Sequence, residues 1–251
     1  MIAYTRSFRA GRSRSGKAGA WQAAHVCGRY AASRRPDDLA GEFEVFRLRL
    51  DTNLEPDWNV APTKDVPAIV EEPDTEGGPP VRVLRVMRWG LIPWWADDPG
   101  VGSRHINARA ETVTEKPVFR EAFAKRRCLL PADGYYEWSA RQPYFLHRRD
   151  GKPLAFAGIY EVWRGIYTCS IVTTQAEDEL GHLHDRMPVF VEPDRYSEWL
   201  DPTVTDPDVV RGLLVPVRGR LDAYPVSRAV GNVRSNGPQL VERVLVDETL
   251  F

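Results

Sequence analysis

Four short stretches of the chain each combine a reactive or ionisable side chain with residues that shape the backbone around it. They are CGRY (27–30), INARAET (106–112), DGYYEW (133–138) and LHDRMP (183–188). Together they offer a thiol, an amide, a carboxylate and an imidazole, which can act as nucleophile, orienting group and proton carriers. Taken singly, each also has an ordinary reading: Cys27 as a small buried residue, Asn107 as a turn cap, Glu137 as a solvent-facing strand residue and His184 as a core or loop histidine.

These stretches belong to a longer series of motifs that occur in a fixed order. The series is VCGRYA, NVAP, WGLIPWW, INARAET, PADGYYEW, HDRMPV and PVSRAVGNVRSNG. It resembles the SRAP family, the SOS-response-associated peptidases that process abasic sites in DNA. The resemblance runs from Cys27 to about Gly237, which is nearly the whole chain apart from the N-terminal leader.

The resemblance implies a covalent capture of abasic sites in single-stranded DNA through an N-terminal cysteine, with a role in the response to DNA damage. The family's four catalytic positions fall on Cys27, Asn107, Glu137 and His184. The arginines of the CGRY and INARAET motifs, Arg29 and Arg109, are then expected to contact phosphates.

The chemistry of an N-terminal cysteine explains why such a residue suits an abasic site, whose sugar opens to an aldehyde. An α-amine has a pKa of about 8 and a thiol of about 8.5, so modest tuning makes both nucleophilic near neutral pH. The amine of Cys27 would form a Schiff base, and its thiol would close on the same carbon to give a five-membered thiazolidine. Glu137 and His184 are suited to the proton transfers, and Asn107 to orienting the amine or a hydroxyl.

An internal cysteine cannot follow this route, because its nitrogen is an amide whose lone pair is delocalised. Here Cys27 follows a leader, residues 1–25, rich in Arg, Ser, Gly and Ala and expected to be disordered. Residues 1–26 carry five basic residues and no acid. We therefore expect the functional chain to begin at Val26, read as an initiator methionine and then trimmed. A transit peptide or a self-cleaved propeptide would expose the same cysteine.

Further residues are expected to hold the DNA strand. Arg186 is a third candidate for phosphate contacts, which give affinity without sequence preference. Three tryptophans could stack on bases, namely Trp94, Trp95 and Trp138, with Trp138 an equally good core residue. The resemblance alone suggests that Pro62 shapes the rim of the groove.

Composition narrows the class of protein. The 251 residues carry a net charge of −1, so any nucleic-acid site must be a local patch. The three cysteines lack metal-type or disulfide-framework spacing, and we expect Cys128 and Cys169 to be buried and inert. No motif calls for a metal or another cofactor, and no transmembrane run or secretory signal is evident. A monomer in a reducing bacterial cytoplasm, associated with the nucleoid when bound to DNA, is the expectation.

The pattern of elements favours an α+β fold in one domain spanning residues 26–251. Short strands are predicted at 81–90, 127–132, 134–140, 143–149, 153–163, 167–174 and 187–193. A short helix is expected after Ser33, capped by Ser33 or Asp37, and another starting at Pro117, with Val118, Phe119, Ala122 and Phe123 on one apolar face. Residues 197–200 and 207–214 indicate two more short helices. Because strands and helices do not alternate regularly, the sheet is expected to be mainly antiparallel or barrel-like, with a few flanking short helices.

Two other functions fit the same residues. A cysteine-dependent peptidase or autopeptidase would pair Cys27 with His184 and would not need a free amine. A non-enzymatic module for single-stranded DNA would bind in a salt-sensitive way and would tolerate loss of Cys27.

Overall fold

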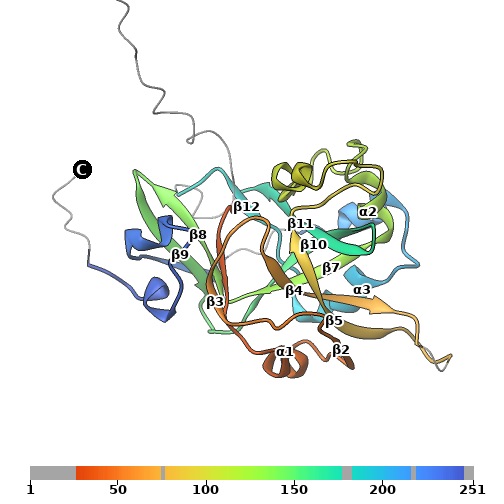
Figure 1. Ribbon diagram of the computed structural model, residues 1–251, viewed down its shortest axis with the longest axis horizontal. Coiled ribbons are helices and arrows are strands. Elements are labelled where there is room, and N and C mark those ends of the chain that lie inside the picture. The colour runs from red at the N-terminus through yellow and green to blue at the C-terminus, as the bar shows by residue number, and fades with distance from the viewer. Residues whose placement is uncertain (1–26, 75–76, 177–182, 216–218, 246–251) are drawn as a thin grey trace, which may run out of the picture.

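The computed structural model describes residues 27–74, 77–176, 183–215 and 219–245. The predicted leader, residues 1–25, therefore lies outside the described residues. The described chain folds into two β-sheets with short helices at their margins (Figure 1).

The larger sheet forms the barrel-like core. Its strand order is β12-β11-β10-β7-β4-β5-β2, and β11 also pairs in parallel with β5, so that five strands close into a ring. The five strands of the ring are β4 (Asp65–Glu72), β5 (Val81–Trp89), β7 (Arg127–Ala132), β10 (Leu154–Trp163) and β11 (Ile166–Gln175). The remaining strands are β2 (Arg47–Arg49), β12 (Arg186–Pro188) and β6 (Asn107–Arg109), which pairs in parallel with β11.

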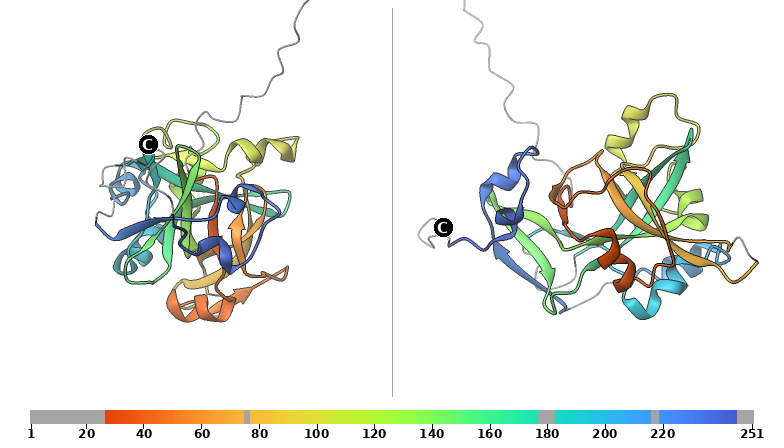
Figure 2. Two further views of the ribbon diagram at one scale, coloured as in Figure 1. Left: turned by 90° about the vertical axis from the view of Figure 1, so that its left-hand side faces the viewer. Right: turned by 60° about the horizontal axis from the view of Figure 1, so that its bottom comes forward.

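The second sheet is five-stranded, in the order β13-β9-β8-β1-β3, and all its pairings are antiparallel. Its strands are β1 (Tyr30–Ala32), β3 (Asp57–Val60), β8 (Gly134–Ser139), β9 (Gln142–Arg148) and β13 (Leu221–Pro225). Figure 2 shows that the C-terminal segment, here residues 226–245, lies against this sheet, away from the barrel. The short strand β1 thus joins the first described residues, from Cys27 onward, to β8.

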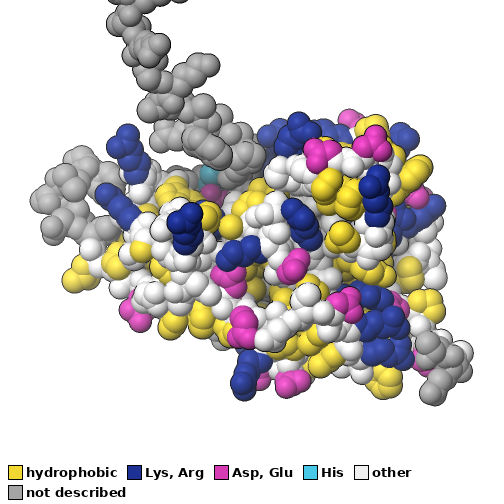
Figure 3. All heavy atoms as spheres, in the orientation of Figure 1, with side chains coloured by type: hydrophobic (Ala, Val, Ile, Leu, Met, Phe, Trp, Pro, Cys, Tyr) yellow, Lys and Arg dark blue, Asp and Glu magenta, His cyan; other side chains and the backbone are white. Residues whose placement is uncertain are grey.

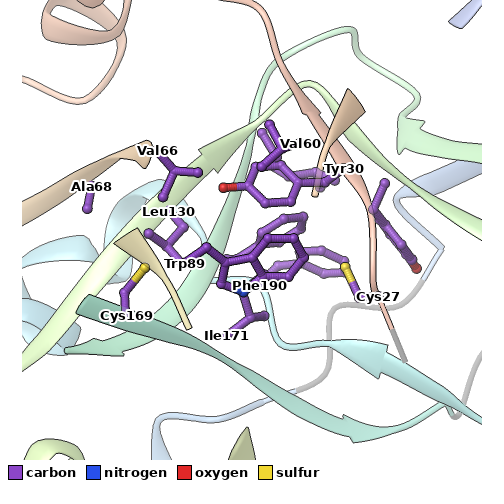
Figure 4. Packing of buried hydrophobic residues seen from close by; sticks show 14 of the residues in the cluster. Cys27, Tyr30, Val60, Val66, Ala68, Trp89, Leu130, Cys169, Ile171 and Phe190 are labelled. Atoms are coloured by element: carbon purple, nitrogen blue, oxygen red, sulfur yellow. The ribbon is translucent and has the colours of Figure 1, made fainter. Parts of the chain in front are cut away.

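Aromatic side chains fill the barrel where the two sheets meet. Tyr30 and Trp89 have no exposed surface, and their ring centroids lie 5.1 Å apart in an edge-to-face arrangement. Phe156 contacts Tyr30 in the same geometry at 5.5 Å. Such pairs add to the stabilisation from burial alone, so β1 is held firmly against the barrel. Figure 4 shows Cys27 at one margin of this cluster and Cys169 at another.

The helices are short and flank the sheets. They are α1 (Pro36–Glu42), α2 (Arg120–Lys125), α3 (Tyr196–Leu200) and α4 (Pro207–Gly212), with 3₁₀ turns η1 (Pro99–Arg104), η2 (Pro193–Arg195), η3 (Arg228–Gly231) and η4 (Pro238–Val241). No described helix is long and apolar enough to span a membrane.

Two predicted helix starts are wrong. Helix α1 begins at Pro36 with Arg35 at the N-cap and without a side-chain cap, because Pro36 already fixes the first turn. The backbone N–H of Ser33 donates to the side chain of Asp133. Ser33 therefore belongs to the connection between β1 and α1 and does not cap the helix. Helix α2 begins at Arg120 rather than Pro117, although Phe119, Ala122 and Phe123 are buried as predicted.

The predicted fold class is confirmed. The strands expected from the sequence are present, except that the strand predicted at 187–193 ends at Pro188. Most pairings are antiparallel, and the structure is mainly β-sheet with a five-stranded barrel-like core. Three pairings are parallel, β11–β5, β11–β6 and β2–β5. The β11–β5 pairing closes the ring, and strand patterns alone do not specify such a long-range contact.

Candidate functional site

Cys27 occupies a strained turn immediately before β1. Its backbone φ is +43°, a left-handed conformation that non-glycine residues rarely adopt, and the residue is fully buried. The antiparallel pairing of Tyr30 with Tyr135 brings this turn alongside the middle of β8. As a result, the backbone nitrogen of Cys27 donates to Oε1 of Glu137 at 2.8 Å.

Glu137 is a buried carboxylate with an abnormal pKa. Only 4% of the residue is exposed, which excludes the solvent-facing reading of this strand position. Burial raises the pKa of its carboxyl to about 8, although the Cys27 N–H lowers it, and the Asp185 carboxylate adds to the rise. The carboxyl can therefore gain or lose a proton near neutral pH, as a general acid or base must.

The thiol of Cys27 is held in its neutral form. Burial, and then the Glu137 carboxylate, raises its pKa well above the ordinary value for cysteine. A neutral thiol is a weak nucleophile. The Glu137 carboxylate thus contacts the backbone N–H of Cys27 and disfavours its thiolate.

His184 lies just before β12 and shares a hollow with Glu137. The hollow is lined by Tyr135, Glu137, Leu146, Ala176, Leu183, His184, Arg186 and Met187. Nδ1 of His184 accepts the backbone N–H of Arg186 at 3.1 Å and also lies 2.9 Å from Oδ1 of Asp185. These two contacts fix the ring at the hollow.

The half-buried Asn107 reaches this end of the molecule through β11. It pairs in parallel with Ile171, and three residues further along β11 Thr174 pairs with Met187 of β12. Asn107 on β6 and the segment that leads from His184 into β12 therefore lie at the same end of β11.

Two arginines continue the site outward. A second hollow is lined by Arg109, Glu111, Thr112, Gln175, Asp185 and Arg186, so that Arg186 borders both hollows. Nη2 of Arg186 lies 2.9 Å from Oε2 of Glu111 and 3.0 Å from the carbonyl oxygen of Thr173. Arg109 is exposed at the end of β6. The two hollows, which share Arg186, connect the buried carboxylate of Glu137 to the exposed Arg109.

Arg29 is engaged within the protein. Its Nη1 donates to Oδ1 of Asn59 at 2.7 Å and to the carbonyl oxygen of Val230 at 2.8 Å, and Nη2 lies 3.4 Å from the carbonyl oxygen of Gly231. The guanidinium thus ties β1 and β3 to the C-terminal segment. A phosphate contact by its remaining donors stays a prediction.

Trp94 and Trp95 stand exposed on a well-anchored loop. Their exposed fractions are 61% and 47%, and their rings meet edge to face with centroids 5.5 Å apart. Trp163 Nε1 donates to the carbonyl oxygen of Ala96, and the amide of Ile92 donates to Thr168 Oγ1 at 3.0 Å. Two apolar faces are therefore presented to solvent in a fixed position.

The last two predicted contact residues differ in their surroundings. Trp138 is half-buried and packs against a small cluster around Tyr136 and Val230. Pro62 is half-buried in the turn between β3 and β4. Stacking of Trp138 on a base, and shaping of the groove by Pro62, stay predictions.

Three further residues shape the site without having been singled out from the sequence. Glu111 pairs with Arg186, Asp185 raises the pKa of Glu137, and the fully buried Asn59 binds Arg29. All three lie inside the motifs INARAET, HDRMPV and NVAP. Their position in these motifs is the one feature of the sequence that marks them, because the partner of each lies far away in sequence.

Comparisons with known proteins cover nearly the whole described chain. A family model described as SOS response associated peptidase (SRAP) matches residues 26–233. The abasic site processing protein YoqW of Bacillus subtilis (strain 168) is 36% identical over 228 residues, covering 86% of this chain and 99% of that protein. The abasic site processing protein YedK of Escherichia coli (strain K12) is 32% identical over 233 residues, covering 87% of this chain and 100% of that protein. A solved structure from Bacteroides thetaiotaomicron has a TM-score of 0.73 at 26% identity, covering 87% of this chain and 100% of that one.

Proposed function

Because the chain belongs to the SRAP family, whose relatives above are abasic site processing proteins, we propose that it captures abasic sites in single-stranded DNA as a covalent adduct through Cys27. The observation that carries the proposal is the 2.8 Å contact between the Cys27 nitrogen and the buried Glu137 carboxylate. We place this activity in the cytoplasmic response to DNA damage.

The reaction forms two bonds at one carbon and releases one water. The amine of Cys27 adds to the aldehyde carbon of the opened sugar, and loss of water gives an imine. The Cys27 thiol then adds to the imine carbon, its proton passes to the nitrogen, and a thiazolidine results. The amine acts first because the buried thiol is neutral.

Glu137 supplies the proton acceptor for these steps. Its oxygen already contacts the reacting nitrogen, and a pKa near 8 suits transfer to and from an amine of similar pKa. His184, in the same hollow, is assigned to protonating the sugar oxygen and the departing hydroxyl. Asn107 orients the amine or a hydroxyl without titrating.

Non-covalent contacts hold the strand while this chemistry proceeds. Arg109 and Arg186 bind phosphates, and Trp94 and Trp95 stack on bases, with Trp138 and Pro62 bordering the groove. A phosphate that pairs with Arg186 must displace Glu111. These contacts give affinity for single-stranded DNA without sequence preference.

The amine of Cys27 must be free for this function. An amide at this position leaves only a reversible thiol adduct. We propose that the functional chain starts at Val26, with the initiator then removed. N-terminal sequencing of the protein from its native host checks this, and a mature chain that retains residues upstream of Cys27 contradicts it.

The defining experiment is a denaturing gel of the chain starting at Cys27, mixed with single-stranded DNA that contains one abasic site. The unsubstituted protein should give a shifted, denaturation-resistant band, and Cys27→Ala should give none. Borohydride should still trap the imine formed by the amine of the Ala variant. Equal shifted bands from both proteins without borohydride would refute the role of Cys27.

A second experiment separates this function from a cysteine peptidase. Acetylation of the Cys27 amine should abolish adduct formation, because the nitrogen becomes an amide. Hydrolysis by the thiol would survive the same treatment. Full adduct yield from the acetylated protein would overturn the proposed route through an imine.

A further inference from the structure

The last motif of the chain, PVSRAVGNVRSNG (225–237), has no part in the chemistry proposed above. Its residues 227–237, here called the arginine rim, run through η3 and the turn that follows it. They contain Arg228 and Arg234 and no acidic residue. In Figure 3, basic side chains stand on the surface over the region where Figure 1 draws β8, β9 and the C-terminal segment.

The backbone of the arginine rim is fixed by side chains from the second sheet. The amide nitrogen of Asn59, a fully buried residue, donates to the carbonyl oxygens of Asn232 and Ser235, each at 2.9 Å. Arg29 adds the bond to Val230 described above. The side chains of Arg29, directly before β1, and Asn59 of β3 therefore hold the backbone of the rim in place.

A second attachment holds the end of the rim. Oδ1 of Asn236 accepts the backbone N–H of Trp58 at 2.8 Å, and its amide donates to the carbonyl oxygen of Pro56 at 3.1 Å. Val230 is fully buried in the cluster that contains Tyr136. The rim therefore presents its outward side chains from a rigid backbone.

The two arginines of the rim, Arg228 and Arg234, carry charge that no acidic partner compensates within the described residues. Both are exposed, and within the described ranges neither side chain has a hydrogen bond or an ion pair. Other arginines of the protein differ: Arg195 pairs with Glu198, and Arg211 with Asp208. Two unpaired guanidinium groups on a fixed backbone are well suited to bind a polyanion.

The rim also adjoins the reactive residues. Arg29, which binds the rim, lies two residues after Cys27, and its carbonyl oxygen accepts the N–H of Tyr136, the neighbour of Glu137. Trp138 and Trp58 are half-buried in the same cluster as Val230. Basic side chains and half-buried indole rings carried by one region are a combination that proteins use to bind single-stranded nucleic acids.

We propose that the arginine rim is a binding surface for the phosphate backbone of the single strand that flanks the abasic site, with Arg228 and Arg234 as its contacts. In this arrangement Arg29 and Asn59 are positioning residues that hold the rim. The inference rests on the proposed function for the identity of the strand. It adds a second basic surface, on a different sheet from Arg109 and Arg186.

The test measures binding without any covalent step. Fluorescence anisotropy of a labelled single-stranded oligonucleotide that lacks an abasic site gives the Kd at several salt concentrations. Arg228→Gln/Arg234→Gln should weaken binding by about tenfold, and should make the dependence of log K on log salt shallower by roughly 1.4, or about 0.7 for each lost phosphate contact. Arg228→Lys/Arg234→Lys keeps the charges and should retain most of the affinity.

A matched control removes the same charge elsewhere. Arg195→Gln/Arg211→Gln changes one half-buried and one exposed arginine, both ion-paired, and should leave both the Kd and the salt slope near those of the unsubstituted protein. Equal effects of the two Gln variants, or an unchanged salt slope for the rim variant, would overturn the proposal. Thermal melting should show that the rim variant remains folded, since its altered side chains have no partners.

A separate arm distinguishes this inference from the proposed function. The rim variant should still form the covalent adduct with abasic DNA, but should need about tenfold more DNA to reach half of its maximal rate, because the rim contributes to binding. Failure of the unsubstituted protein to form an adduct would contradict the capture chemistry, while the anisotropy result would still decide the role of the rim.

Discussion

The barrel holds three cysteines, Cys27, Cys128 and Cys169, and all three are fully buried. Their backbones differ in what they bind. The carbonyl oxygen of Cys128 accepts from Trp199 Nε1 at 2.9 Å, and that of Cys169 accepts from the amide of Gly90 at 2.8 Å. Cys27 instead directs its nitrogen at a carboxylate. Burial alone therefore does not distinguish the three cysteines, whereas the group that each backbone binds does.

The pKa values of the three thiols do not separate the cysteines either. Burial raises the pKa of each thiol, so none of them is a ready thiolate. The Sγ atom of Cys128 fills the space left by Gly158, where an added Cβ would lie 2.7 Å from the sulfur. That sulfur has a packing role. At Cys27 the backbone N–H instead contacts the Glu137 carboxylate, and the following predictions test whether that carboxylate serves capture.

The largest effect is expected from removing the carboxylate. Glu137→Gln keeps the size of the side chain but cannot accept a proton, so adduct formation by the chain with a free Cys27 amine should slow by about 10²–10⁴-fold. The ratio of the two rates should grow as pH rises toward about 8, where Glu137 loses its proton. Single-turnover kinetics across this range measure it, and a pH-independent ratio near one would show that Glu137 has no such role.

A smaller effect is expected on stability. In the folded protein the pKa of Glu137 is about 8, against about 4.5 for an ordinary Glu. The folded state therefore binds more protons between these values, and stability falls as pH rises through this window, by at most about 1.4 kcal/mol per pH unit. Thermal melting of the full chain should show a steeper decline from pH 5 to 8 than Glu137→Gln does. Parallel profiles would contradict the raised pKa.

The smallest effect on capture is expected at the other two cysteines. Cys128→Ala and Cys169→Ala should each leave the rate of adduct formation within about twofold, while each loses roughly 1 kcal/mol of stability from the vacated volume. Denaturant unfolding and the same kinetic assay measure both quantities. A capture rate reduced as strongly as by Glu137→Gln, in a variant that remains folded, would remove the distinction between Cys27 and the other two.

Much of the architecture could be predicted from local patterns. Strands such as β5, β7 and β10 follow from apolar and β-branched runs between turn residues, and the burial of Phe123 follows from helical spacing. The helix starts were less predictable, because a proline can replace a side-chain cap at α1 or precede the helix at α2. Closure of the barrel through the parallel β11–β5 pair depends on long-range packing, which no local pattern encodes.

For the site, the sequence determined which reactive groups exist and that Cys27, Asn107, Glu137 and His184 lie in motifs of a known family. Only the tertiary structure decided that Glu137 is buried and bound to the Cys27 nitrogen, because that contact joins residues 110 positions apart. It also decided that Arg29 binds the C-terminal segment while Arg228 and Arg234 stand free in solvent. The physical reason is the same in each case: a pKa, or the availability of a charge, depends on desolvation and on partners brought together by the fold rather than on the residue type.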